Sequence, residues 1–311
     1  MIPQAGVSLR SYDYLRRLAG EQFESSPIWD AHTHIGRDHD GRSLDVDGLL
    51  ADLDRYHVAG AVVFPFNDPD QGVDFRIPNE RVWKVCQQVP ERLIPFMRLN
   101  LNGPWEAEYG RGVERGCRGI KLHPRAQCFS LSSPTVQPLF ARAAADGLPI
   151  LVHTGLGMTA ITDDLAALAT DFPDLKLVLA HSSFIDMPDA LRVLAAYPNV
   201  YFETSVVRMY DLFTVLCTVD PQRVIYGSDL PYASSYTALL TLVMTAYFAR
   251  VDPTWLPDLL GRNLLRLIAP ERLSATPQSP NAERSPEPKQ ASESVAARSG
   301  RPDRPAGKDA R

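Results

Sequence analysis

Two histidines separated by one residue could bind a metal ion near the N-terminus of this sequence. His32 and His34 end the apolar run IWDAHTH at residues 28–34. Side chains at positions i and i+2 of a strand point to the same face, so we expect the two imidazoles to lie side by side. Neutral imidazoles bind Zn²⁺ and similar ions, but strand alternation also produces H-x-H by chance. The pair therefore needs further ligands before it predicts a metal site.

Other residues of this kind also lie at the ends of apolar runs. Five of the seven histidines do so, whereas His39 lies in the first loop and His57 in a helix-like segment. The later runs end in Lys121, His123, His153, His181 and Asp229. If the runs are parallel strands, these side chains converge at one edge, and we interpret the convergence as a divalent-metal site with a position left for water. For any one histidine taken alone, a hydrogen-bonded core role is the alternative.

Eight short apolar runs bounded by Gly and Pro could supply those strands. They span residues 28–34, 61–66, 93–100, 119–124, 150–155, 176–182, 200–206 and 224–231. So little polar interruption is typical of strands covered on both faces. Helix-like segments separate the runs, and the clearest is residues 45–60, with Gly60 as its expected left-handed cap. This alternation predicts an α/β fold, a (β/α)8 TIM barrel followed by C-terminal helices, with the convergent residues at its mouth.

The domain organisation follows from composition. A doubly wound open sheet is the alternative fold, but no G-x-G-x-x-G follows any of the runs. We expect the barrel over residues 28–272, a helical extension at 1–27 and a disordered tail at 273–311. From Ser274 onward the chain is rich in Ser, Pro, Ala and Arg, and Val295 is its one aliphatic β-branched residue. Such a segment cannot bury enough apolar surface to offset the entropy of ordering it.

Charge and cysteine spacing narrow the classes of partner. The formal net charge is −5, and the last 38 residues hold seven Lys/Arg against five Asp/Glu, so the remainder is more acidic still. An acidic body disfavours binding to nucleic acid and to anionic membranes. No run approaches the ~20 apolar residues of a membrane span. The four cysteines show no C-x-x-C spacing, which disfavours a zinc ribbon and a disulfide framework, so we expect a cytoplasmic protein. The expected partner is a small-molecule substrate, and a homo-oligomer is possible.

The ordered motifs resemble those of a known enzyme family. DAHTHIG, GIKLHP, PILVHTG, LVLAHSS, VYFETS, VIYGSDLPY and GRNLLRLI are similar, in this order, to motifs of the amidohydrolase superfamily. The resemblance is to its amidohydrolase-related branch, which includes aminocarboxymuconate-semialdehyde decarboxylase-like proteins, and covers residues 28 to about 269. It implies one catalytic divalent ion, with Zn²⁺ favoured, held by His32, His34, His153 and Asp229. His181 would then polarise the substrate, or would bind a second ion bridged by a carboxylated Lys121; one ion is favoured.

These residues predict metal-assisted hydrolysis of a small amide, lactone or ester. Asp229 would accept the proton of an activated water and His181 would stabilise the oxyanion, with Lys121 as the third candidate catalytic residue. Non-oxidative decarboxylation of a small unsaturated or aromatic acid is the alternative, and a non-catalytic metal-binding barrel is the second alternative. The candidate substrate-binding residues are Arg37, His123 and Arg125, because basic side chains can bind a substrate carboxylate.

Overall fold

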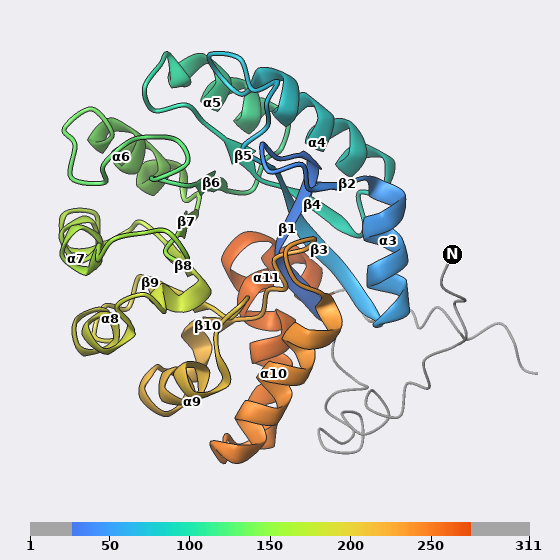
Figure 1. The fold of residues 1–311 in the computed structure, drawn as a ribbon, viewed down its shortest axis with the longest axis vertical. Helices are drawn as coiled ribbons and strands as arrows, with labels where there is room; N and C mark the ends of the chain where they lie inside the picture. Colours follow the sequence, from blue (N-terminus) through green and yellow to red (C-terminus); the bar gives the residue numbers. More distant parts are fainter. Residues whose placement is uncertain (1–26, 275–311) are drawn as a thin grey trace, which may run out of the picture. The chain divides into compact units, whose positions relative to one another are not determined.

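Parallel strands form a closed barrel in the computed structural model, which describes residues 27–274 (Figure 1). The barrel strands are β1 (Ile28–Arg37), β3 (Val58–Pro65), β4 (Leu93–Pro95), β5 (Met97–Arg98), β6 (Ile120–Leu122), β7 (Ile150–His153), β8 (Leu177–Ala180), β9 (Val200–Glu203) and β10 (Val224–Ile225). The short strand β2 (Ser43–Leu44) pairs antiparallel with the end of β1. The predicted α/β barrel is confirmed, and each of the apolar runs contains barrel-strand residues.

Two junctions close the sheet. β4 and β5 are one strand interrupted at Phe96, whose N–H donates to the Val63 carbonyl at 2.9 Å. At the other junction a parallel bridge joins Thr33, in β1, to Leu230, which follows β10. The first and last strands are therefore neighbours, and the residues that follow the strands gather at one end of the barrel, where the active sites of this fold lie.

Helices surround the strands in a ring (Figure 1). They are α3 (Val46–Arg55), α4 (Arg76–Gln88), α5 (Trp105–Glu114), α6 (Gln137–Asp146), α7 (Thr162–Asp171), α8 (Met187–Leu194), α9 (Met209–Thr218) and α10 (Ser235–Phe248). The expected C-terminal helices follow as a π-helical turn at Asp258–Arg262 and α11 (Asn263–Ile268). Leu264 and Leu265 of α11 pack with the inner residues of the barrel strands, so this helix belongs to the barrel core.

Buried apolar residues form two layers, one inside the strands and one between strands and helices. The inner layer contains Trp29, Ala31, Val62, Phe64, Ile94, Phe96, Leu151, Val178, Ala180 and Ile225. Residues between them in the sequence, such as Val63, Leu93 and Leu177, belong to the outer layer. Strands buried on both faces explain why the runs read as continuous apolar stretches.

The register of β1 against β3 shifts between Asp30 and Thr33. Trp29, before the shift, and Ala31, inside the irregular stretch, both pack in the inner layer. His32, inside the same stretch, and His34, after it, also face that layer, with ring centroids 5.2 and 4.6 Å from the Phe64 ring. An irregularity of this kind changes which alternate residues face inward, and it brings both histidines into the barrel.

The role expected for Gly60 is wrong. Helix α3 ends at Arg55, and the left-handed residue after it is His57, with φ of 55°. Gly60 instead lies inside β3, where a Cβ atom would come within 2.3 Å of the Arg92 carbonyl oxygen and 2.5 Å of the Trp29 ring. Glycine is needed there because backbone and ring approach closely.

Replacing Gly60 by alanine should therefore destabilise the protein by about 1–3 kcal/mol, since the added methyl group overpacks a buried strand. Equilibrium unfolding in urea measures the change. Gly110→Ala is the matched control: Gly110 lies in α5 with no heavy atom within 4 Å of an added Cβ, so helix propensity alone should stabilise it by about 0.5–1 kcal/mol. Equal effects of the two substitutions would contradict the packing account.

The predicted helical extension at residues 1–27 and tail at 273–311 lie outside the described residues, apart from Pro27, Leu273 and Ser274. Among residues 27–274, no helix is long and apolar enough to cross a membrane.

Candidate metal centre and active site

Three predicted ligands meet where the first and last strands adjoin. His32 Nε2 lies 3.1 Å and His34 Nε2 lies 3.2 Å from Asp229 Oδ1. All three side chains are buried. The two histidines come from β1, and Asp229 follows β10, so the site depends on closure of the barrel. Two imidazoles and one carboxylate directed at a common point are a donor set for Zn²⁺ or a similar divalent ion.

Backbone contacts fix the position of Asp229. Its N–H donates to the His32 carbonyl at 2.8 Å, and its φ of 64° is left-handed. Asp30, which is buried, accepts from the N–H groups of His32 and Ser228, both at 2.9 Å. The Asp30 carboxylate thus connects the backbone of His32 to the turn that contains Asp229. Left-handed backbone at a non-glycine residue costs free energy and is concentrated at functional sites.

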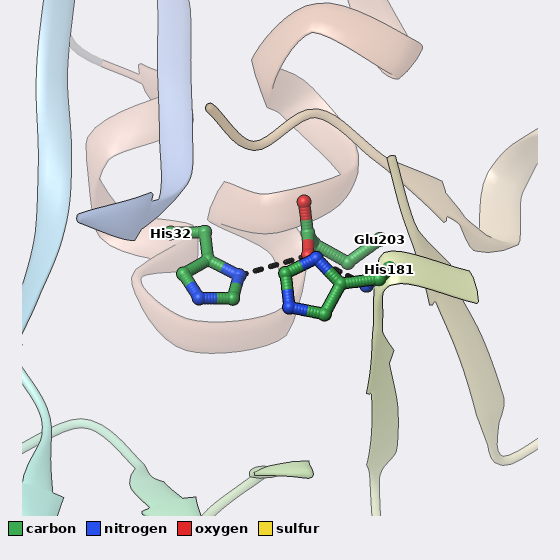
Figure 2. A group of neighbouring side chains, drawn as sticks. All are labelled: His32, His181 and Glu203. Atoms are coloured by element: carbon green, nitrogen blue, oxygen red, sulfur yellow. Dashed lines mark hydrogen bonds and ion pairs between the residues drawn. The ribbon is translucent and has the colours of Figure 1, made fainter. Parts of the chain in front are cut away.

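Glu203, at the end of β9, orients His32 from the other side. Its Oε2 atom accepts from His32 Nδ1 at 2.9 Å and from the His181 backbone N–H at 3.1 Å (Figure 2). It also accepts from Ser205 Oγ at 2.8 Å. A Cβ at Gly227 would come within 2.1 Å of Glu203 Oε1, so glycine is needed for the carboxylate to lie there. With Nδ1–H bound to a carboxylate, His32 directs Nε2 toward Asp229, where Nε2 can either carry a proton or bind a metal ion through its lone pair, as metal-binding histidines do.

His32, His181 and Glu203 form a second cluster of ligand-type atoms (Figure 2). The hydroxyl of Ser205 lies inside it, with Oγ 2.8 Å from Glu203 Oε2, 2.9 Å from His181 Nδ1 and 3.3 Å from His32 Nδ1. This cluster is therefore satisfied by hydrogen bonds. The group of His32, His34 and Asp229 is the better candidate for an ion.

The electrostatics of that group suit a cation. Burial holds the pKa of His34 at about 3, so its imidazole is neutral. Burial raises the pKa of Asp229, but His32 and the hydrogen bonds from both imidazoles outweigh it and leave the pKa well below its usual range. Burial and Lys121 lower the pKa of His32, yet Asp229 and Glu203 raise it on balance. The carboxylates of Asp229 and Glu203 thus favour a positive charge at His32. Either a proton on His32 Nε2 or a bound divalent ion can supply that charge.

The fourth predicted ligand, His153, lies outside the group. Its Nδ1 atom is 3.1 Å from His181 Nε2, and its Nε2 atom is 3.2 Å from the Leu156 carbonyl. Its ring stacks on His123, with centroids 3.8 Å apart. Burial lowers the pKa of His181 to about 4 and that of His123 to about 2. The three histidines are thus neutral neighbours of the metal group, and His153 as a direct ligand stays a prediction.

Lys121 reaches the metal group from β6. Its Nζ atom lies 3.2 Å from His32 Nε2 and 5.0 Å from the centre of the Phe64 ring. Burial lowers the pKa of the amine to about 7, so both protonation states are populated at neutral pH. A carboxylated lysine needs the neutral amine, and a salt link to a substrate needs the protonated one, so the role of Lys121 stays a prediction.

Two of the three predicted substrate-binding residues have other partners. The Arg37 side chain is 59% exposed, and its Nη2 atom lies 3.9 Å from Asp70 Oδ2. Arg125 is exposed and donates from Nη1 to the Gly157 carbonyl at 2.8 Å. His123 is the one brought next to the histidine cluster, through its stacking on His153.

Comparison with known proteins identifies the family. The amidohydrolase family profile matches residues 29–268. The chain belongs to the amidohydrolase family. A comparison with curated protein sequences finds no match.

Solved structures share the fold. An amidohydrolase from Burkholderia multivorans is 18% identical with a TM-score of 0.62, and the alignment covers 78% of this chain and 99% of that one. The 2,6-dihydroxybenzoate decarboxylase from Rhizobium is 16% identical with a TM-score of 0.59, covering 78% and 98%. A protein from Acinetobacter baumannii described as a probable 2-pyrone-4,6-dicarboxylic acid hydrolase is 15% identical with a TM-score of 0.57, covering 77% and 98%. Amidohydrolase-type barrels of this kind thus include both hydrolases and decarboxylases.

Three polar residues of this region are not among the predicted site residues. Glu203 and Ser205 lie two residues apart within the seventh apolar run, residues 200–206, the same i, i+2 spacing that pointed to the histidine pair. Arg98 lies near the end of the third run, residues 93–100, and is buried. Polar residues in the last part of a run were the criterion for the histidines, and applying it to every run would have found all three.

Proposed function

We propose that the protein is a metal-dependent hydrolase that cleaves a small amide, lactone or ester. The observation that carries the proposal is that His32 Nε2 and His34 Nε2 lie 3.1 and 3.2 Å from Asp229 Oδ1 at the barrel mouth. His32, His34 and Asp229 would hold the ion, with His153 as the fourth ligand after rotation of its ring. Zn²⁺ is the ion we propose, because imidazole and carboxylate suit it.

The side chains around the ion have distinct tasks. A bound divalent ion would supply an acidified water and polarise the acyl oxygen of the substrate. Asp229, ionised because its pKa is held low, would accept the proton of that water and pass it to the leaving group. His181, neutral and with its Nδ1–H donating to the Ser205 carbonyl, would accept at Nε2 from His153 Nδ1–H and so orient that ring. Glu203 would keep His32 in the tautomer with Nε2 free.

Elemental analysis of the purified protein, followed by hydrolysis assays with lactone, ester and amide panels, tests the proposal. We expect about one ion per chain, and loss of turnover when a chelator removes it, with recovery on adding Zn²⁺. A protein that hydrolyses members of the panel at an undiminished rate after the metal has been removed would contradict the proposal. So would full metal occupancy with no turnover on any panel.

Non-oxidative decarboxylation is the second candidate. It is favoured by the likeness of the barrel to 2,6-dihydroxybenzoate decarboxylase and by the cationic side chains of Lys121 and Arg98, buried on adjacent strands. Release of carbon dioxide from a carboxylic-acid panel, without uptake of water into the product, would decide for it over hydrolysis.

A further inference from the structure

Arg98 is a buried cation at the barrel mouth without a carboxylate partner. It ends β5 and is 1% exposed. Its Nη1 atom donates to the Pro65 carbonyl at 3.3 Å, and its Nε atom is buried with no hydrogen-bond partner. Within residues 27–274 no acidic side chain lies within ion-pair distance of it, although the charge of Asp38 acts on it from farther away. Leaving a buried charge unpaired is costly, so an unpaired guanidinium needs a reason.

The backbone that carries Arg98 is held rigidly. Asn79 of α4, fully buried, accepts from the Arg98 N–H at 2.9 Å and donates to the Arg98 carbonyl at 2.9 Å. Asn79 also donates to Glu108 at 2.7 Å, and Arg111 holds that carboxylate at 2.9 Å. Glu108 thus orients the Asn79 side chain that holds the Arg98 backbone, and it makes no ion pair with the Arg98 guanidinium. Locking the surrounding residues is what orients a binding side chain.

The neighbours of Arg98 place it beside the metal group. Arg98 and Lys121 are register partners on β5 and β6, and paired strands are about 4.8 Å apart. Lys121 in turn contacts His32 at 3.2 Å. The Arg98 guanidinium lies 5.8 Å from the Phe75 ring, so part of its surround is apolar. Burial lowers the pKa of Arg98 to about 10 while the charges of Asp38 and Tyr232 oppose the shift, and the side chain stays charged at neutral pH.

We propose that Arg98 binds a carboxylate of the substrate, so that the acyl compound cleaved at the metal group carries a free carboxylate a few bonds from the scissile bond. The inference rests on the proposed function, and it deepens it by naming the substrate class. A guanidinium presents donors in a planar fork that matches a carboxylate, and an amide or ester without the anion would leave that fork unpaired. The site should therefore discriminate against uncharged analogues.

Calorimetric titration of the full-length protein with benzoate and with its neutral isostere benzamide tests the inference. We expect the wild type to prefer benzoate, and Arg98→Met to weaken benzoate binding on the order of 10-fold to 100-fold while benzamide binding and metal content stay unchanged. Arg98→Lys keeps the positive charge but loses the planar pair of donors, so it should lose less benzoate affinity than Arg98→Met. If Arg98→Met does not fold, the loss of benzoate affinity in Arg98→Lys is the test. Arg208→Met is the control, because Arg208 is 62% exposed and paired with Asp211.

Equal binding of benzoate and benzamide by the wild type would overturn the inference, as would unchanged benzoate affinity in Arg98→Met or an equal loss in Arg208→Met. Inorganic phosphate that binds more tightly than benzoate would overturn the choice of a carboxylate. The proposed function can fail independently of this inference. Benzoate binding that depends on Arg98, in a protein without metal-dependent turnover, would support the anion site and contradict the hydrolase. Metal-dependent turnover without a preference for benzoate would support the hydrolase and contradict the anion site.

Discussion

Replacing Asp229 by asparagine is expected to lower the hydrolytic rate by about 10²-fold to 10⁴-fold, the usual contribution of a positioned general base. Asparagine keeps an oxygen near His32 and His34 but cannot accept the proton of a water. It also tolerates the left-handed backbone at this position, where φ is 64°. The fold should therefore survive, and steady-state kinetics together with circular dichroism on the same sample measure both properties.

Two observations guard the interpretation of Asp229→Asn. Metal content measured on the variant separates loss of the base from loss of the ion. Asp163→Asn, at an exposed aspartate in the first turn of α7, controls for the change in charge and should keep the wild-type rate. If Asp229→Asn turned over at the wild-type rate, another group would have to be the base.

Glu203→Gln should weaken Zn²⁺ binding by about 10-fold to 100-fold, because partners that orient a ligating histidine typically contribute that much. Glu203 accepts hydrogen bonds at both oxygens, from His32 and Ser205 among others. A glutamine amide can accept at only one, so one donor loses its partner and the His32 tautomer is no longer fixed. Competition with a fluorescent chelator measures the affinity.

Glu271→Gln is the charge control for this experiment. Glu271 is exposed and pairs with Arg118 at 2.9 Å, so its loss should leave Zn²⁺ affinity and the unfolding midpoint unchanged. Unaltered affinity in Glu203→Gln would mean that His32 is oriented by other contacts, or that the ion binds elsewhere.

The barrel and its mouth could be predicted because burial on both faces gives parallel strands a continuous apolar signal. Polar residues at or near the ends of these runs were visible in the sequence, which is how His32, His34 and Asp229 were found, although β1 continues past both histidines to Arg37. Their meeting is a consequence of topology, since parallel strands end at one edge. Boundaries were less predictable: the last run covers residues 224–231, but β10 is only Val224–Ile225.

Side-chain contacts across the barrel could not be predicted from a single amino-acid sequence. That Glu203 reaches His32 depends on the space left by Gly227, and the sequence does not show that the Arg98 guanidinium lacks an ion-pair partner. Simple alternation also fails in β1, because the register shifts after Asp30. Gly60 was assigned to a helix cap because a glycine after a helix is usually one, whereas the Trp29 ring requires it.

The junction between β1 and β10 has a consequence for folding. His34 and Asp229 are 195 residues apart in sequence, so their two side chains come together only after the whole barrel has been built. A metal ion held by both would bridge the first and last strands and oppose their separation. At a free concentration of 100 times its dissociation constant it would add about 2.7 kcal/mol to the stability of the native state, so the chain would be most easily unfolded wherever the ion is scarce.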